Sequence, residues 1–337
     1  MPATCGELVQ GVDGDGPFLV SCPIDLWSTA RCTRGPARSG LRVVPADRTR
    51  TAAALAAFLE QHDGASLEVQ LEGRLPTGRG YGSSTADIAS ALSAAAALLG
   101  TALSTQSLGR LATAIEPTDS SFAPGLAVFD HVAGDRLELL GEPPAAWILI
   151  ADRGIELTTA AVHRRAGPGL SGAEPAAALE LLRAAVAEQD VALLGRASTL
   201  SAQVNQRRLP NPLFEPLRRL AARCSGAGVV VAHSGTLAGV LFADPEAAAR
   251  GQAMAARELG RELVLRVHRL CGGGVDVRTT LGDTRLAEGR HLVENADRRL
   301  HEGQGEHGPG ALAQPQIEIQ QRAKTEAVER DGVTELL

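Results

Sequence analysis

Apolar and polar positions alternate over Leu67–Leu75, where Leu67, Val69 and Leu71 are separated by acidic and amide side chains. This period of two residues predicts a half-buried strand. The pattern changes after a glycine-rich turn, because residues 84–99 are mostly Ala, Leu, Ile and Ser, which predicts a closely packed helix. Ser84 and Asp87 also fit a capping box at the start of that helix. The stretch is therefore predicted to be a strand, a turn and a helix.

The same patterns along the rest of the chain predict a mixture of helices and short strands. Further strands are predicted at 18–22, 41–44, 137–140, 147–151, 228–232, 237–243 and 262–267. Further helices are predicted at 52–61, 105–115, 175–189, 191–206, 212–224 and 247–259. This mixture favours an α+β fold.

The length of 337 residues favours two domains over one core. A stretch rich in Gly and Pro at 164–174 is a predicted linker, which places the domains at 1–165 and 175–280. Residues 281–337 are polar and poor in apolar side chains, so they are predicted to form a flexible C-terminal tail. His301 and His307 in that stretch are expected to be solvated rather than to bind metal.

The turn between the strand and the helix has the layout of a phosphate cradle. Gly78, Gly80 and Gly82 permit positive φ angles and close backbone approach, so successive amides can converge on an anion. The helix that follows adds unpaired amides and the positive end of its dipole. A capped strand-turn-helix without a ligand is the alternative, and this stretch alone leaves both open.

Lysine usage excludes several kinds of nucleotide or cofactor site. A Walker loop, a protein-kinase strand lysine and a pyridoxal phosphate Schiff base each need a lysine, and the only lysine in the sequence is Lys324. The dinucleotide fingerprint also fails, because Ser83 stands where its third glycine would fall. A nucleotide here would be held by amides, hydroxyls, arginines and a metal.

Charge and cysteine usage narrow the class of protein. The formal net charge is -6 and arginines are scattered among acids, which disfavours a nucleic-acid partner. The five cysteines form no CxxC pair, and their odd number disfavours a complete disulfide framework. No uncharged apolar run approaches the about 20 residues of a membrane span, and no signal peptide precedes the first motif. A cytoplasmic protein with no membrane partner is expected, and the oligomeric state is left open.

Three segments together resemble the motifs of the GHMP kinases. Pro2–Gly11 (PATCGELVQG) resembles the first motif of the family, Pro76–Asp87 (PTGRGYGSSTAD) the second, and Ala232–Gly239 (AHSGTLAG) the third. Further segments are similar in sequence to the L-threonine kinase branch of the family: Ser21–Thr29, Glu116–Ser121 and Phe129–His131. The resemblance covers roughly the first 280 residues. It implies an ATP-binding first domain like domain 2 of ribosomal protein S5, and a ferredoxin-like second domain.

The activity implied by this resemblance is phosphoryl transfer from ATP, with Mg²⁺, to the side-chain hydroxyl of L-threonine. The product would serve the aminopropanol linker of adenosylcobalamin. Two alternatives stay open: a GHMP kinase for another small alcohol such as homoserine, and a catalytically silent nucleotide-binding regulator.

Candidate catalytic residues come from the acidic turn and the cradle. Phosphoryl transfer needs positioning, charge neutralisation and a carboxylate near the attacking hydroxyl. By resemblance, Asp119 takes the position of the catalytic aspartate, while Glu116 and Ser84 are expected to bind the metal. Asp119 as a cap of the next turn is the alternative. The residues expected around the ATP phosphates are Pro76, Gly78, Arg79, Gly80, Tyr81, Gly82, Ser83, Ser84 and Thr85.

The acceptor needs partners for both of its charges, because burying either one unpaired is costly. Asp25 is the candidate for the ammonium group, or else a structural cap. Arg79 is a candidate for the acceptor carboxylate or the phosphates, or else is solvated. Ser234, Gly235 and Thr236 are expected on the substrate or phosphate side, or else form a tight turn between strands. Two residues keep two readings each: Glu7 positions the N-terminal strand or pairs with an arginine, and His233 contacts substrate or lies in the core.

Overall fold

The computed structural model describes residues 1–62, 64–73, 75–156, 170–233, 235–280 and 316–318. Its strands are β1 (Pro2–Asp13), β2 (Gly16–Trp27), β3 (Thr29–Arg34), β4 (Leu41–Val44), β5 (Leu67–Glu72), β6 (Leu126–Phe129), β7 (Leu137–Gly141), β8 (Trp147–Asp152), β9 (Gly228–Val231), β10 (Ala238–Phe242), β11 (Val264–Arg269), β12 (Arg278–Thr280) and β13 (Gln316–Glu318). Its helices are α1 (Thr49–Leu59), α2 (Ser83–Leu99), α3 (Thr105–Thr113), α5 (Ala173–Glu188), α6 (Val191–Asn205), α7 (Phe214–Arg223) and α8 (Pro245–Glu258). The α+β class expected from the sequence is confirmed.

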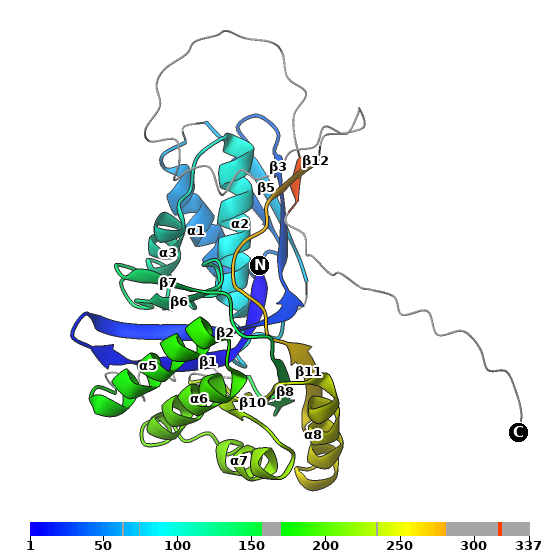
Figure 1. The fold of residues 1–337 in the computed structure, drawn as a ribbon. Helices are drawn as coiled ribbons and strands as arrows, with labels where there is room; N and C mark the ends of the chain where they lie inside the picture. The colour runs from blue at the N-terminus through cyan, green and yellow to red at the C-terminus, as the bar shows by residue number, and fades with distance from the viewer. Residues whose placement is uncertain (63, 74, 157–169, 234, 281–315, 319–337) are drawn as a thin grey trace, which may run out of the picture.

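A single large sheet runs through both halves of the molecule. Its strand order is β11-β8-β10-β9-β1-β2-β6-β7, and the long β1–β2 hairpin lies in its middle (Figure 1). The connection between the halves is the pairing of β1 with β9, where Glu7 lies opposite Val231. The first motif of the sequence is therefore a strand shared by both halves.

The first half adds a smaller sheet, with strand order β12-β13-β3-β5-β4, and helices α1, α2 and α3 (Figure 1). Helix α2 is buried along most of its length, and Ala86, Ala89 and Ala94 are fully buried. Small side chains let this helix lie close to its neighbours, which fits a chain with only 3% aromatic residues. The rigid packing of α2 fixes the position of the cradle at its N-terminus.

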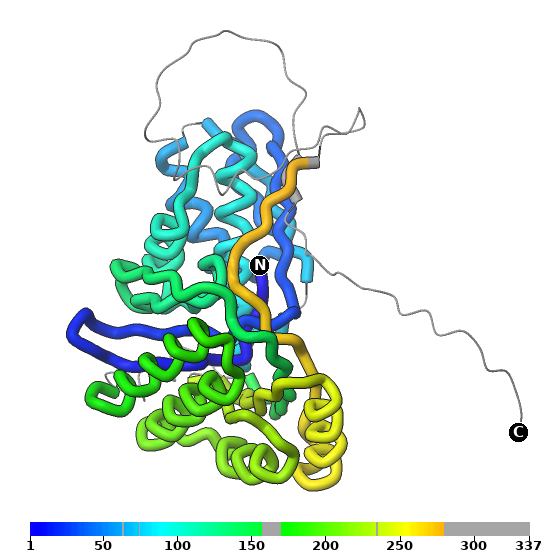
Figure 2. The backbone as a smooth tube through the Cα atoms, in the orientation of Figure 1, coloured from blue at the N-terminus to red at the C-terminus, as the bar shows by residue number. Residues whose placement is uncertain are grey.

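Strand pairing in the large sheet crosses the boundary expected near residue 165. Strand β8 precedes residue 165, yet it lies between β10 and β11 in the part of the sheet that α5 to α8 accompany. After β11 the chain returns to the first half, where the Cys271 amide donates to Pro23 O and the Gly273 amide to Gly125 O (Figure 2). Local patterns predict where strands occur, but strand partners depend on contacts distant in sequence.

Four strands of the first half that lie before residue 281 have no counterpart in the predicted elements: β1, β3, β6 and β12. β1 and β6 are buried almost throughout, so they lack the alternation that marks a half-exposed strand. Within 281–337, residues 316–318 form a strand in which Ile317 pairs with Cys32, and the low apolar content did not predict it. The rest of that range, and residues 164–169 of the predicted linker, lie outside the described residues.

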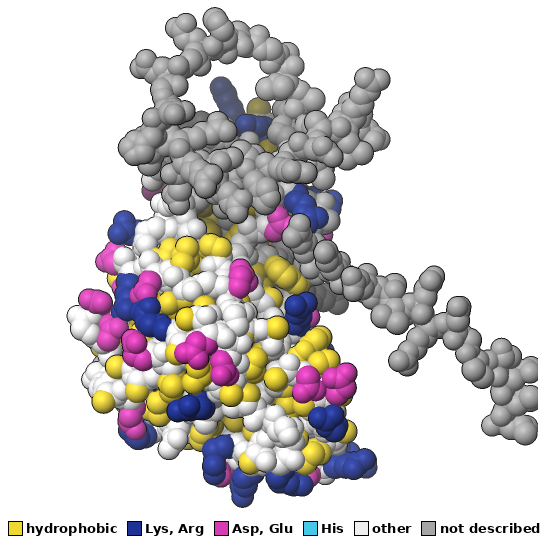
Figure 3. All heavy atoms as spheres, viewed as in Figure 1, with side chains coloured by type: hydrophobic (Ala, Val, Ile, Leu, Met, Phe, Trp, Pro, Cys, Tyr) yellow, Lys and Arg dark blue, Asp and Glu magenta, His cyan; other side chains and the backbone are white. Residues whose placement is uncertain are grey.

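The surface carries charges of both signs. On the face in Figure 3, acidic and basic side chains are interspersed over both halves. Within the described part of the chain, no helix combines the length and the apolar character needed to cross a membrane.

Candidate active site

The three glycine-containing motifs meet at the loop before α2. From β1, the Thr4 amide donates to Tyr81 O at 2.9 Å and the Gly6 amide to Gly80 O at 3.2 Å. From the third motif, the Thr236 amide donates to Arg79 O at 2.9 Å. The loop is thus fixed on both sides by main-chain hydrogen bonds from segments far away in the sequence.

Two glycines of the loop occupy positions where a side chain would not fit. Gly80 has φ +105°, and a Cβ there would lie 2.4 Å from the Cβ of Ala232. Gly82 has φ +64°, and its Cβ would lie 2.7 Å from Asp119 Oδ2. These glycines therefore permit both the left-handed backbone and the close approach of the loop to its neighbours.

The capping box predicted at Ser84 and Asp87 is wrong. Helix α2 begins after Gly82, and no side chain caps it. The Ser84 hydroxyl instead donates to Glu116 Oε1, and Asp87 accepts a 2.6 Å hydrogen bond from Ser28 Oγ. Because no side chain covers the first turn, its amides and the helix dipole are available to an anion.

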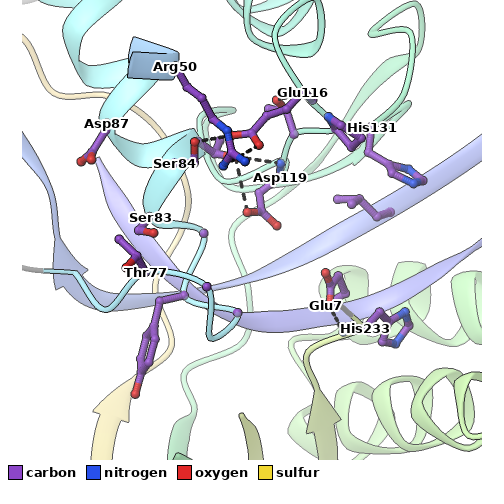
Figure 4. Close-up of a pocket in the computed structure, with 18 of the residues that line it drawn as sticks. Glu7, Arg50, Thr77, Ser83, Ser84, Asp87, Glu116, Asp119, His131 and His233 are labelled. Carbon is purple, nitrogen blue, oxygen red and sulfur yellow. Dashed lines mark hydrogen bonds and ion pairs between the residues drawn. The ribbon is translucent and has the colours of Figure 1, made fainter. Parts of the chain in front are cut away.

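These amides face a pocket of about 400 Å³ (Figure 4). The cradle residues that line it are Gly78, Gly80, Tyr81, Gly82, Ser83, Ser84 and Thr85. Glu116 and Asp119 of the acidic turn also line it, whereas Pro76 and Arg79 do not. The structure therefore brings most of the predicted phosphate-side residues and both carboxylates into one cavity.

Asp119 is half-buried and lines this pocket. Its carboxylate accepts hydrogen bonds from the Ser21 and Thr85 hydroxyls, each at 3.4 Å, and its amide donates to Thr85 Oγ1 at 3.1 Å. Burial, reinforced by the nearby Glu116 carboxylate, raises the pKa of Asp119 to about 6. A carboxylate held by hydroxyls and poised near neutral pH suits the acceptance of a proton from an alcohol.

Glu116 lies beside the start of α2 and makes two contacts. One carboxylate oxygen accepts from the Ser84 hydroxyl, and the other is 2.9 Å from the Arg50 guanidinium of α1. Hydroxyl and carboxylate oxygens are hard donors of the kind that Mg²⁺ takes, in small number, when phosphates supply the remaining ligands. No group of three or more His, Cys, Asp or Glu side chains suited to a metal occurs in the described segments, so an ion here would need ligands from a bound phosphate.

The side chains of Arg79 and Tyr81, which were predicted around the ATP phosphates, both reach Asp152. Arg79 NH1 and the Tyr81 hydroxyl each lie 3.3 Å from Asp152 Oδ2, at the end of β8. Alternate side chains of the loop therefore point to the second half of the molecule. Arg79 thus ties the cradle loop to β8 in the second half of the molecule.

The other end of the pocket is a polar cluster. Its members are Glu7, Gln10, His131, Arg208 and His233. Glu7 accepts a 2.8 Å hydrogen bond from the His233 amide. Burial and the proximity of Asp119 raise the pKa of Glu7 to about 8. Burial, with the Arg208 and His131 charges, lowers the pKa of His233 to about 3.

The neutral His233 ring has one nitrogen directed to a protein acceptor and one without. Nδ1 lies against Gln10 Oε1, which accepts its proton. His233 Nε2 and Arg208 Nε are buried and have no hydrogen-bond partner among the described residues. Buried polar atoms of this kind are costly unless a ligand satisfies them.

The remaining predicted residues lie elsewhere. Asp25 does not line the pocket: it is 45% exposed and contacts β11, where its carboxylate is 2.9 Å from His268 Nδ1. It follows Ser21 by four residues, or about 13 Å along an extended strand, which removes it from Asp119. Gly235 and Thr236 contact the main chain of the cradle at Arg79 rather than the pocket, and Ser234 lies outside the described residues.

Several pocket residues were not predicted from the sequence, above all Arg48 and Arg50 from the start of α1, and Arg208 from the loop after α6. Nothing in their local sequence distinguishes them from other arginines. The sequence did offer a reason to consider His131 and Gln10, because each lies in a segment that resembles the family motifs.

Comparison with known proteins agrees with this geometry. Residues 49–129 match the model of the GHMP kinases N terminal domain, and residues 181–261 match that of the GHMP kinases C terminal domain. The chain is 35% identical to an L-threonine kinase of Salmonella typhimurium over 245 residues, which is 72% of this chain and 81% of the relative. It is also 35% identical to an L-threonine kinase of Citrobacter freundii, over 72% of this chain and 84% of that relative.

Solved structures share the fold at lower identity. A homoserine kinase from Cytophaga hutchinsonii superposes with a TM-score of 0.63 at 17% identity, covering 81% of this chain and 94% of that one. A mevalonate kinase gives 0.60 at 12% identity, covering 80% and 98%. The chain has the two-domain fold of the GHMP kinases, belongs to that family and is a small-molecule kinase.

Proposed function

We propose that this protein transfers the γ-phosphoryl group of ATP to the side-chain hydroxyl of L-threonine and forms O-phospho-L-threonine. The observation that carries the proposal is the half-buried Asp119, which lies in one pocket between the uncapped N-terminus of α2 and the polar cluster around Glu7 (Figure 4). A phosphate end and an acceptor end thus lie on either side of a carboxylate that can take the hydroxyl proton.

The donor end is assigned to the cradle. The amides at the start of α2 and the Ser83 and Thr85 hydroxyls contact the outer phosphates of ATP. Ser84 and Glu116 hold Mg²⁺, which supplies neutralisation of the phosphate charge when bound. The Asp119 carboxylate accepts the proton of the attacking hydroxyl and orients its oxygen toward the γ-phosphorus.

The acceptor end is assigned to the polar cluster, because a zwitterionic amino acid matches its charges. Arg208 pairs with the substrate carboxylate through a guanidinium whose Nε has no partner among the described residues. The ammonium lies near Glu7 and Asp119, where a positive charge relieves the repulsion between these two carboxyl groups. Neutral His233 Nε2 can accept one of its protons.

Threonine is preferred to homoserine because the relatives at 35% identity are L-threonine kinases, whereas the homoserine kinase match rests on the fold at 17% identity. A role in supplying the aminopropanol linker of adenosylcobalamin, in the cytoplasm, follows if threonine is the acceptor. A silent regulator is disfavoured, because the cradle, Glu116 and Asp119 are all present in one pocket.

The test is ADP release from ATP and Mg²⁺ with L-threonine, L-serine, L-homoserine or no acceptor, and mass detection of the product. We expect O-phospho-L-threonine at a kcat/KM well above that for the other two alcohols. Selective phosphorylation of homoserine would reassign the acceptor, and tight ATP binding with no turnover on any alcohol would favour the regulator.

A further inference from the structure

Arg50 is the pocket arginine that contacts Glu116, beside the predicted site of phosphoryl transfer. It lies in the first turn of α1, and its guanidinium is 2.9 Å from Glu116 Oε2 (Figure 4). The other oxygen of Glu116 accepts from Ser84, in the first turn of α2. One carboxylate therefore ties Arg50 to the amide end of the cradle.

The need for a cation here follows from the charges of the pocket. Glu116 and Asp119 are two carboxylates at the place where the outer phosphates of a nucleotide would lie, and they would repel it. The only lysine of the chain is Lys324, so the cationic side chain of the cradle must be an arginine. Three arginines line the pocket: Arg48, Arg50 and Arg208.

The positions of the other two arginines favour Arg50. Arg208 belongs to the opposite end, where it interacts with Glu7. Arg48 Nε lies 3.3 Å from Asp87 Oδ2, and Asp87 is held in turn by Ser28. Arg50 alone of the three contacts the Ser84–Glu116 pair. Its side chain is 47% exposed, so a guanidinium with five donors can accept a further anionic partner there.

We propose that Arg50 binds the outer phosphates of the nucleotide and stabilises the charge of the transferring phosphoryl group. Glu116 holds the guanidinium at the mouth of the cradle before the nucleotide arrives. The guanidinium group of arginine is well suited to charge-assisted, bidentate hydrogen bonds with phosphate oxygens. The assignment rests on the proposed function for the identity of the nucleotide, but not on the identity of the acceptor.

The experiment measures the affinity of the full-length chain for ATP, ADP and AMP by calorimetry, without any acceptor and with Mg²⁺. In Arg50→Gln, ATP affinity should fall about 10- to 100-fold, as expected for a lost charged hydrogen bond. AMP affinity should stay within about twofold, because AMP lacks the outer phosphates. Arg50→Lys should recover part of the loss. Equal ATP affinity in Arg50→Gln and the unsubstituted chain would overturn the proposal.

Arg42→Gln is the matched control. Arg42 also forms an ion pair with a glutamate, at 2.8 Å from Glu68, but it is more exposed and does not line the pocket. We expect unchanged nucleotide affinities in this variant. A loss as large as that of Arg50→Gln would mean that net charge, not position, explains the effect.

A second set of variants, made in a chain that carries Glu116→Gln, distinguishes direct phosphate contact from a role in which Arg50 only positions Glu116. If Arg50 contacts phosphate, Arg50→Gln should still weaken ATP binding in a Glu116→Gln chain. If it acts only by orienting Glu116, the substitution should be silent there, and that result would overturn the proposal. A third result would overturn only the acceptor assignment: the unsubstituted chain does not phosphorylate threonine, but Arg50→Gln still weakens ATP binding.

Discussion

Asp119 is the residue on which the proposed chemistry depends. It lies in a turn held by Ser21 of β2 and Thr85 of α2, so its carboxylate is fixed by two elements rather than by its own loop. The resemblance placed Asp119 in the acidic turn Glu116–Ser121, and the structure brings that turn to the pocket that the cradle lines.

Replacing Asp119 with Asn should lower kcat by about 10²- to 10⁴-fold, because an amide cannot accept the hydroxyl proton. The substitution is nearly isosteric, so ATP affinity should stay within a few-fold. Steady-state ADP release, combined with calorimetric ATP binding, separates the two effects. The Ser120→Ala variant alters the same turn without touching the carboxylate and should retain far more activity. Unchanged turnover in Asp119→Asn would assign the proton acceptor elsewhere.

The raised pKa of Asp119, about 6, gives a second test at this scale. A base is active when ionised, so kcat/KM should fall about tenfold per pH unit below pH 6 and level off above it. The measurement is kcat/KM for the acceptor between pH 5 and pH 8 at constant ionic strength. The residual activity of Asp119→Asn should lack this acidic limb. A flat profile over the whole range would contradict proton acceptance by this group.

At the scale of elements, Gly235 and Thr236 of the third motif pack against the cradle loop and do not line the pocket. Gly235 lies so close to the loop that an added Cβ would stand 2.3 Å from Arg79 O. Gly235 and Thr236 therefore contact the loop that lines the pocket, whereas His233 of the same motif lines the pocket itself. The sequence could not distinguish these two roles, because both require a small residue between strands.

Gly235→Ala should therefore displace the cradle and weaken ATP binding, by about tenfold or more, although residue 235 does not line the pocket. Gly14→Ala is its matched control, because nothing lies within 4 Å of a Cβ there. Calorimetric ATP affinity and the thermal midpoint of both variants are the measurements. An unchanged ATP affinity in Gly235→Ala would show that the loop adapts without cost to its function.

The whole molecule is joined by the sheet that passes from β9 to β1. Because that sheet is continuous, both halves should unfold in one cooperative transition. The two tryptophans report on them separately: Trp27 ends β2 and Trp147 begins β8.

Trp27→Phe and Trp147→Phe each leave one fluorescent reporter in one half. In urea, the fluorescence midpoint of each variant should coincide with its own midpoint by far-ultraviolet circular dichroism. Comparing probes within one variant removes any change in stability caused by the substitution. Separate midpoints would show that the two halves unfold independently and that the β1–β9 pairing contributes little.

The sequence by itself determined the features that depend on neighbours along the chain. The alternation of Leu67–Leu75, the three glycines and the alanine-rich helix predicted strand, loop and α2, because local backbone preferences and one-face burial shape such a stretch. The mixture of predicted helices and strands indicated the α+β class, and the resemblance to the family motifs added the two carboxylates of the acidic turn.

The tertiary structure decided which polar groups meet. Ser84 and Asp87 could have capped their own helix, but Glu116 and Ser28 offer them partners from other elements. Asp25 points to β11 instead of the acceptor, and Arg50 and Arg208 reach the pocket from α1 and from the loop after α6. A hydrogen bond or an ion pair depends on distance in space, which a single sequence does not contain.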